Sequence, residues 1–237
     1  MVTRIEKNKS KSLTFESFIN KTYGYMFSGM LVTAFITFFM LYTNVVMGLF
    51  SINNGTASLN LFGYLAFYGP FCTLLFLSFK RIDTFSIGAA KIIFFALSIM
   101  FGFMMSILVL NSSMGVVFQS LLGTSAIFAG SALIGHYTKR NLSFLGRIAY
   151  NLMFGLVIIS IISLVIGSSF RSVVYSYVVI ALSSVIVAYT HQNLKSVYSF
   201  FSYHSDESDK IAIFGALSLY IDFINIFTSL LNLSNRK

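Results

Sequence analysis

Asp222 is the side chain of this protein best suited to chemistry, because it is the one acidic residue that falls inside a long apolar segment. It stands in the middle of residues 211–233. At about 1.5 Å per helical residue, its carboxyl group would lie near the midplane of a bilayer. An ionisable group at that depth costs roughly 2.5–3.5 kcal/mol to insert. We therefore expect Asp222 to hold or pass an ion or a proton.

A stripe of polar residues surrounds Asp222 in the sequence. These residues are spaced four, three, four and three apart, which places them on one face of a helix: Ser218, Asp222, Asn225, Ser229 and Asn232. Such a face would leave hydrogen-bonding groups unsatisfied in lipid, so we expect it to contact protein or water. Hydrogen bonding between helices is the alternative role. It explains Ser218, Ser229 and Asn232 well, but Asn would serve at position 222 without the cost of ionisation.

The composition indicates an integral membrane protein. Of 237 residues, 57% are hydrophobic and 10% are charged, against about 25% charged in soluble domains. The apolar residues gather in runs of bilayer length. We therefore predict an all-α membrane protein with seven transmembrane helices, of which the seventh is central and surrounded by helices 1–6. The predicted spans are residues 23–49, 61–79, 85–110, 114–135, 148–166, 172–190 and 211–233.

The distribution of basic residues predicts the orientation. With these spans, thirteen Lys and Arg residues fall on one side of the membrane and three on the other. Positive residues favour the cytoplasmic side, so we expect the N-terminus in the cytoplasm and the C-terminus across the membrane. Residues 1–21 then form a basic cytoplasmic tail, and residues 22–237 form a single seven-helix domain. The short connections favour a bacterial inner membrane. The first apolar run is too long for a signal peptide, so we expect it to be retained.

Several other classes of protein are disfavoured. The basic residues are spread over short loops instead of forming one patch, which argues against nucleic-acid binding. The three histidines are scattered, so no metal-ligand spacing and no resident cofactor is predicted. An intramembrane aspartyl protease needs two acids that share a proton, and only Asp222 is available. We therefore expect that the protein is not an enzyme.

Two stretches resemble a known family. Residues 215–227 read GALSLYIDFINIF, and this segment resembles the signature of the Bax inhibitor-1 family (transmembrane BAX inhibitor motif proteins). Residues 139–147 read KRNLSFLGR and resemble the second recognisable stretch of that family. The resemblance implies a fold in which helix 7 is surrounded by the other six helices. It also implies a calcium leak that responds to pH.

The resemblance also implies roles for particular residues. In that family, an aspartate on helix 7 and one on helix 6 share a proton and hold the pore closed. Asp222 matches the first position, whereas the second is Thr190, so the like-charge pair on which that pH switch rests is missing here. His191, the next residue, could supply a cation that keeps Asp222 ionised. A basic residue after helix 2 contacts the pair in some relatives, and Lys80 or Arg81 matches it.

These observations favour a passive leak of calcium or another cation, open to modulation by pH. Asp222 would bind the cation weakly at the constriction. Ser218, Asn225 and Ser229 would line the path, and Thr190 would close it from helix 6. Hard oxygen ligands suit Ca²⁺, and a site with a single carboxylate suits conduction better than tight binding. Two alternatives remain open: a proton-coupled solute transporter with Asp222 as the proton carrier, and a regulatory membrane protein that conducts nothing. The expected partners are the lipid bilayer and cations.

Overall fold

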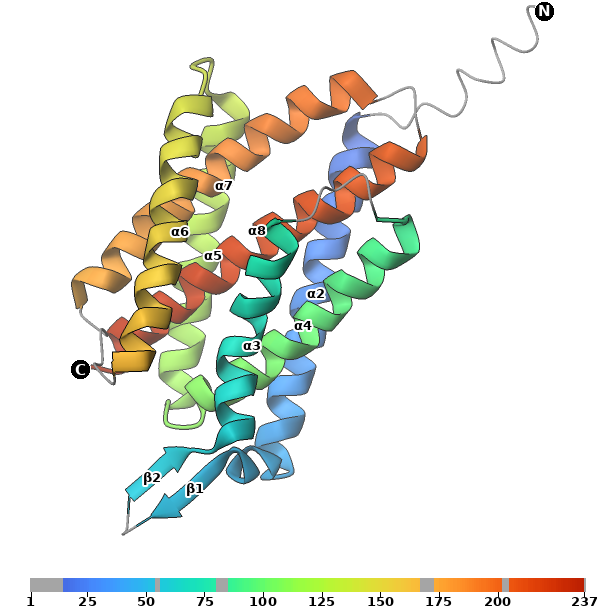
Figure 1. The fold of residues 1–237 in the computed structure, drawn as a ribbon. Coiled ribbons are helices and arrows are strands. Elements are labelled where there is room, and N and C mark those ends of the chain that lie inside the picture. The colour runs from blue at the N-terminus through green and yellow to red at the C-terminus, as the bar shows by residue number, and fades with distance from the viewer. Residues whose placement is uncertain (1–14, 54–55, 80–84, 167–172, 202–204, 237) are drawn as a thin grey trace, which may run out of the picture. The chain divides into compact units, whose positions relative to one another are not determined.

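The computed structural model describes residues 15–53, 56–79, 85–166, 173–201 and 205–236. Within these ranges, seven helices are long and apolar enough to cross a membrane. The prediction of an all-α fold with seven spans is therefore confirmed. The described residues fall into two compact units (Figure 1). Unit 1 contains the described residues from 15 to 22 and from 114 onward, and unit 2 contains those between 23 and 113.

Unit 2 contains three of the membrane-length helices and one β-hairpin. Its elements are most of α2 (Phe15–Tyr42), η1 (Val45–Leu49), β1 (Phe50–Asn53), β2 (Thr56–Leu59), α3 (Leu61–Ser78) and α4 (Ile87–Val109). The strands pair antiparallel, with Phe50 opposite Leu59. Helix α3 packs on α4 and on η1. Asn60 caps α3, because its side chain accepts a hydrogen bond from the backbone N–H of Gly63 at 2.9 Å.

Unit 1 holds the polar stripe. Its elements are residues 15–22 of α2, α5 (Met114–Tyr137), α6 (Ser143–Ile166), α7 (Val173–Phe201) and α8 (Ser205–Ser234). Helix α7 packs on α5, α6 and α8, and α8 packs on α5 as well as α7. Within this unit, α7 thus contacts all three other complete helices extensively. That the last helix is surrounded by all six others stays a prediction.

The helix boundaries differ from the predicted ones at three places. Helix α2 begins at Phe15, inside the predicted tail, and ends at Tyr42. The hairpin that follows was not predicted. Most of the predicted loop at residues 191–210 is helical, because α7 continues to Phe201 and α8 begins at Ser205. Hydropathy locates the apolar part of a helix, which crosses the membrane. A helix can continue beyond that part through polar residues, so hydropathy does not locate its ends.

Candidate functional site

Asp222 lies in the interior of unit 1. It is 4% exposed, and its Oδ2 atom is buried without a hydrogen-bond partner among the described residues. Ser229, two turns further along α8, is also buried, whereas Ser218 and Asn225 are half-buried. The stripe predicted from the sequence therefore points inward, and its acidic member has an oxygen that the described protein does not satisfy. Such an atom is costly in an apolar interior.

Three hydroxyl groups meet one helical turn before Asp222. The Tyr150 hydroxyl of α6 lies 2.9 Å from Ser218 Oγ of α8 and 3.2 Å from Thr190 Oγ1 of α7. Ser218 and Thr190 were both predicted as site residues, and the structure connects them through Tyr150. The sequence analysis did not identify Tyr150.

Helix α7 carries a second stripe of hydroxyl groups. Ser176, Ser183 and Thr190 are spaced seven residues apart, and all three are buried. Residues seven apart lie on the same face of a helix. Ser176 accepts a hydrogen bond from Asn232 Nδ2 of α8 at 3.5 Å. Ser183 Oγ is buried without a partner in the described part of the chain.

The two stripes face each other. Ser176 contacts Asn232 and Thr190 is connected to Ser218, so α7 and α8 run antiparallel with their polar faces together. Hydrogen bonds join the stripes at both of these levels. Between the two levels lie Ser183 and Asp222, and each has a buried oxygen that no described group satisfies. Buried polar atoms of this kind usually have an unseen partner, such as water or an ion.

Helix α5 supplies the third wall of this region. Its Phe128 ring packs edge-on against Phe223 of α8 at 5.8 Å between ring centroids. Phe223 directly follows Asp222, so α5 packs on α8 at the level of Asp222. On the same helix, Ser120 and Thr124 are buried, and Thr124 donates a hydrogen bond to the Ser120 carbonyl at 2.7 Å. At the level of Asp222, α5 therefore contributes apolar packing.

Of the predicted modulators, the structure describes His191. His191 Nε2 lies 3.3 Å from His136 Nδ1 of α5, so the structure places His191 against another histidine. Lys80 and Arg81 lie outside the described residues. No group of three or more His, Cys, Asp or Glu residues that could hold a metal occurs in the described segments. Asp222 with neighbouring hydroxyls therefore offers at most a weak cation site.

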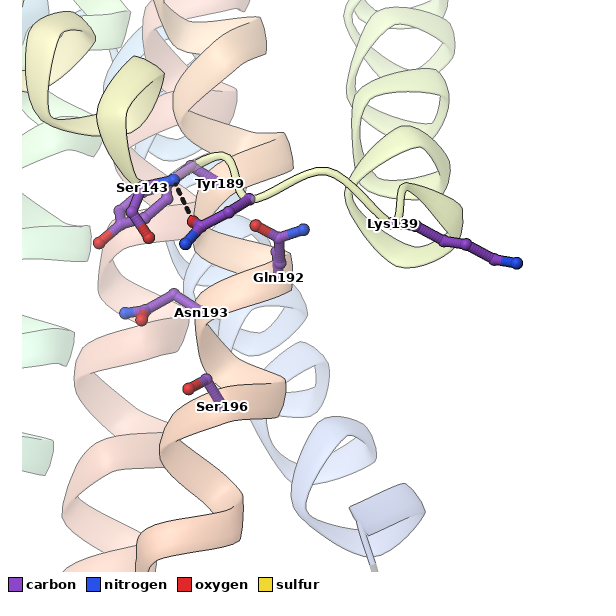
Figure 2. Close-up of a pocket in the computed structure, with 7 residues that line it drawn as sticks. Lys139, Ser143, Tyr189, Gln192, Asn193 and Ser196 are labelled. Carbon is purple, nitrogen blue, oxygen red and sulfur yellow. Dashed lines mark hydrogen bonds between the residues drawn. The ribbon is translucent and has the colours of Figure 1, made fainter.

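A separate polar pocket of about 310 Å³ lies at the turn between α5 and α6 (Figure 2). It is lined by Lys139, Asn141, Ser143, Tyr189, Gln192, Asn193 and Ser196. Gln192 of α7 supports this turn: its Oε1 accepts from Leu142 N at 2.8 Å, and its Nε2 donates to the Arg140 carbonyl at 2.9 Å. In Figure 2 the Lys139 side chain extends away from Asn193 and Ser196. The pocket therefore concentrates no charge, and we interpret it as part of a structural turn.

Comparison with known proteins identifies the family. The family model described as "Inhibitor of apoptosis-promoting Bax1" matches residues 15–237. The chain belongs to the Bax inhibitor-1 family. The resemblance inferred from residues 215–227 and 139–147 is thus confirmed.

Bacterial membrane proteins are similar to this chain over nearly their full length. An uncharacterized membrane protein of Streptococcus pyogenes serotype M6 is 32% identical over 225 residues, which is 93% of each chain. The inner membrane protein YbhL of Escherichia coli K12 is 26% identical over 224 residues, 94% of this chain and 93% of its own. Together with the seven spans, these matches establish an integral, multi-pass membrane protein.

Proposed function

We propose that this protein is a passive leak channel for calcium or another cation, with a path along the polar face of α8 and Asp222 at its constriction. The observation that supports the proposal best is the buried Asp222 carboxyl, whose Oδ2 has no partner among the described residues. A carboxyl group that served only to hold helices together would be hydrogen-bonded. A group that meets a passing cation needs a free oxygen.

The chemistry around Asp222 suits weak binding of a hard cation. Carboxylate and hydroxyl oxygens are the ligands that Ca²⁺ prefers. Asp222 supplies the one negative charge, and Ser183 and Ser229 supply neutral oxygens on the facing stripes. Conduction requires that an ion can leave as well as enter, so a site with one carboxylate fits a leak better than storage.

The proposed location is the inner membrane of a bacterium, with the N-terminus in the cytoplasm. The asymmetry of basic residues supports this orientation. The similarity to YbhL, an inner membrane protein by name, supports the compartment. A leak in that membrane would let cations move down their gradient.

Calcium flux into proteoliposomes tests the proposal. The wild-type protein should raise Ca²⁺ entry above that of protein-free vesicles, and Asp222→Asn should lower it by roughly tenfold or more, because an intramembrane charge is lost. Asp209→Asn is the matched control, since Asp209 is paired with Lys21 near the start of α8. Equal flux through the wild type and Asp222→Asn would overturn the role of Asp222.

A proton-coupled transporter is the second candidate, because the same partnerless carboxyl could carry a proton. The two functions differ in what drives them. Vesicles with an internal pH indicator and no added calcium separate them. Alkalinisation or acidification that depends on Asp222 and on an added solute would favour the transporter, whereas calcium flux without proton movement would favour the leak.

A further inference from the structure

Tyr150 holds a position that neither the family match nor the sequence assigns to any role. Its hydroxyl joins α6, α7 and α8 near the proposed path, through Thr190 at 3.2 Å and Ser218 at 2.9 Å. A phenol has one proton to donate and lone pairs to accept. The Tyr150 hydroxyl can therefore donate to one of these two groups and accept from the other, so both hydrogen bonds form together.

This cluster lies directly beside Asp222 along the stripe. Ser218 precedes Asp222 by four residues, which is one turn on the same face of α8. Thr190 belongs to the α7 stripe that continues to Ser183. An ion that moved between the α7 and α8 stripes, past Asp222 and toward the α5–α6 turn, would have to separate Thr190 from Ser218. Tyr150 bridges that pair.

The ring of Tyr150 is placed so that it can move without damage to the core. The residue is 41% exposed, although its hydroxyl reaches between the two stripes. Its ring packs edge-on against Tyr189 of α7, with 6.1 Å between centroids. Because the side chain is not enclosed, a change of rotamer would break two hydrogen bonds without leaving a large buried cavity.

We propose that Tyr150 is the closing residue of the path, a latch that holds Thr190 and Ser218 together in the closed state. This inference rests on the proposed cation leak. When the Tyr150 side chain changes rotamer, Thr190 and Ser218 are no longer held together, and the path next to Asp222 opens between α7 and α8. The closed state is favoured by the two hydrogen bonds, so their loss shifts the population toward the open state.

The test compares Ca²⁺ flux through proteoliposomes that contain the wild type, Tyr150→Phe or Tyr175→Phe. Phe keeps the ring and removes only the hydroxyl. Tyr175→Phe is the matched control, because the Tyr175 hydroxyl also joins α6 to α7, lying 3.1 Å from Ser160 Oγ, but away from Asp222. We expect Tyr150→Phe to raise flux roughly five- to thirtyfold, which corresponds to one or two hydrogen bonds. Tyr175→Phe should leave flux near the wild-type value.

Two further variants separate a latch from simple structural support. Ser218→Ala breaks the same contact, so it should also raise flux, and combining it with Tyr150→Phe should add little to either single change. Adding Asp222→Asn to Tyr150→Phe should remove the extra flux, because the ions pass Asp222. A merely structural role would lower the melting temperature without producing flux that depends on Asp222.

The outcomes separate this inference from the proposed function. If the wild type conducts and Tyr150→Phe, with an unchanged melting temperature, conducts equally or less, the latch is wrong while the leak stands. If neither the wild type nor Tyr150→Phe conducts, both proposals are wrong. If only Tyr150→Phe conducts, and Asp222→Asn abolishes that flux, the latch is supported and the wild type is closed under the assay conditions.

Discussion

Gly135 of α5 lies directly against the backbone carbonyl of Ala188 of α7. A Cβ at position 135 would overlap that carbonyl, and backbone atoms cannot turn aside as a side chain can. The close approach of α5 and α7 therefore depends on the absence of a side chain at this one position. Thr190, which contacts Tyr150, lies only two residues after Ala188 on α7 and is therefore close to this contact.

We predict that Gly135→Ala destabilises the protein by about 1–3 kcal/mol, because α5 and α7 must separate. A lower melting temperature in detergent would show it. Gly130→Ala, on the same helix, is the control, since a Cβ there meets nothing within 4 Å. It should leave the stability unchanged or raise it by up to about 1 kcal/mol, because alanine has the higher helix propensity. If Gly135→Ala raises the stability as Gly130→Ala does, helix propensity decides, and not the contact with Ala188.

Ser183→Ala should separate stability from function. Its Oγ is buried without a described partner, so removing it deletes an unsatisfied polar group, and the melting temperature should stay constant or rise. If Ser183 lines the ion path, calcium flux should fall roughly fivefold, the equivalent of one hydrogen bond. Ser184→Ala is the control, because the Ser184 hydroxyl donates to the Ile180 carbonyl within α7. A marked loss of stability in Ser183→Ala would mean that the hydroxyl has a structural partner.

The seven helices were predictable because bilayer-length apolar runs are a strong and local signal. Their ends were less predictable, since residues 191–196 are mostly polar and still helical. The hairpin after α2 was missed because the apolar residues 45–49 continued the hydropathy of the first span. Asn54 and Gly55 were a usable sign, since Asn-Gly is typical of tight hairpin turns.

The site was predictable only where it follows the periodicity of a single helix. Asp222, Ser218 and Ser229 were found because the spacing within α8 places them on one face. The α7 stripe could have been found in the same way, from the seven-residue spacing of Ser176, Ser183 and Thr190. Tyr150 could not, because its contacts join three helices, and no periodicity within α6 shows which neighbours its hydroxyl reaches.

Gln192 should stabilise the turn between α5 and α6. Gln192→Ala removes both the acceptor for Leu142 N and the donor to the Arg140 carbonyl, and leaves two backbone groups without these partners. We expect a loss of about 1–3 kcal/mol and faster hydrogen exchange at the Leu142 amide. Asn193→Ala, at the next and exposed position, should change neither. Unchanged exchange at Leu142 in Gln192→Ala would show that the turn is held by other contacts.

The ion pair of Lys21 with Asp209 should contribute modestly to stability. Lys21 lies on the part of α2 that belongs to unit 1, and Asp209 lies near the start of α8. Both side chains are about one-third exposed, at 34% and 28%, so screening by water limits the interaction. A double-mutant cycle with Lys21→Gln and Asp209→Asn should give a coupling energy of about 0.5–1 kcal/mol. That coupling should shrink as salt is raised from about 0.05 to 0.5 M. A coupling energy that does not change with salt concentration would indicate that the two side chains interact by something other than charge attraction.

The orientation in the membrane follows from charge and can be measured with single cysteines. The chain has one native cysteine, Cys72, so Cys72→Ser provides a background without thiols. Ser196 on α7 and Asn235 after α8 are both exposed, and they lie on opposite sides of the predicted topology. A membrane-impermeant maleimide should label Asn235→Cys in intact spheroplasts and Ser196→Cys only after lysis. This result would place the thirteen basic residues on the cytoplasmic side, as the positive-inside rule predicts. The reverse pattern of labelling would mean that the basic residues do not set the orientation, and would place the α5–α6 turn outside the cell.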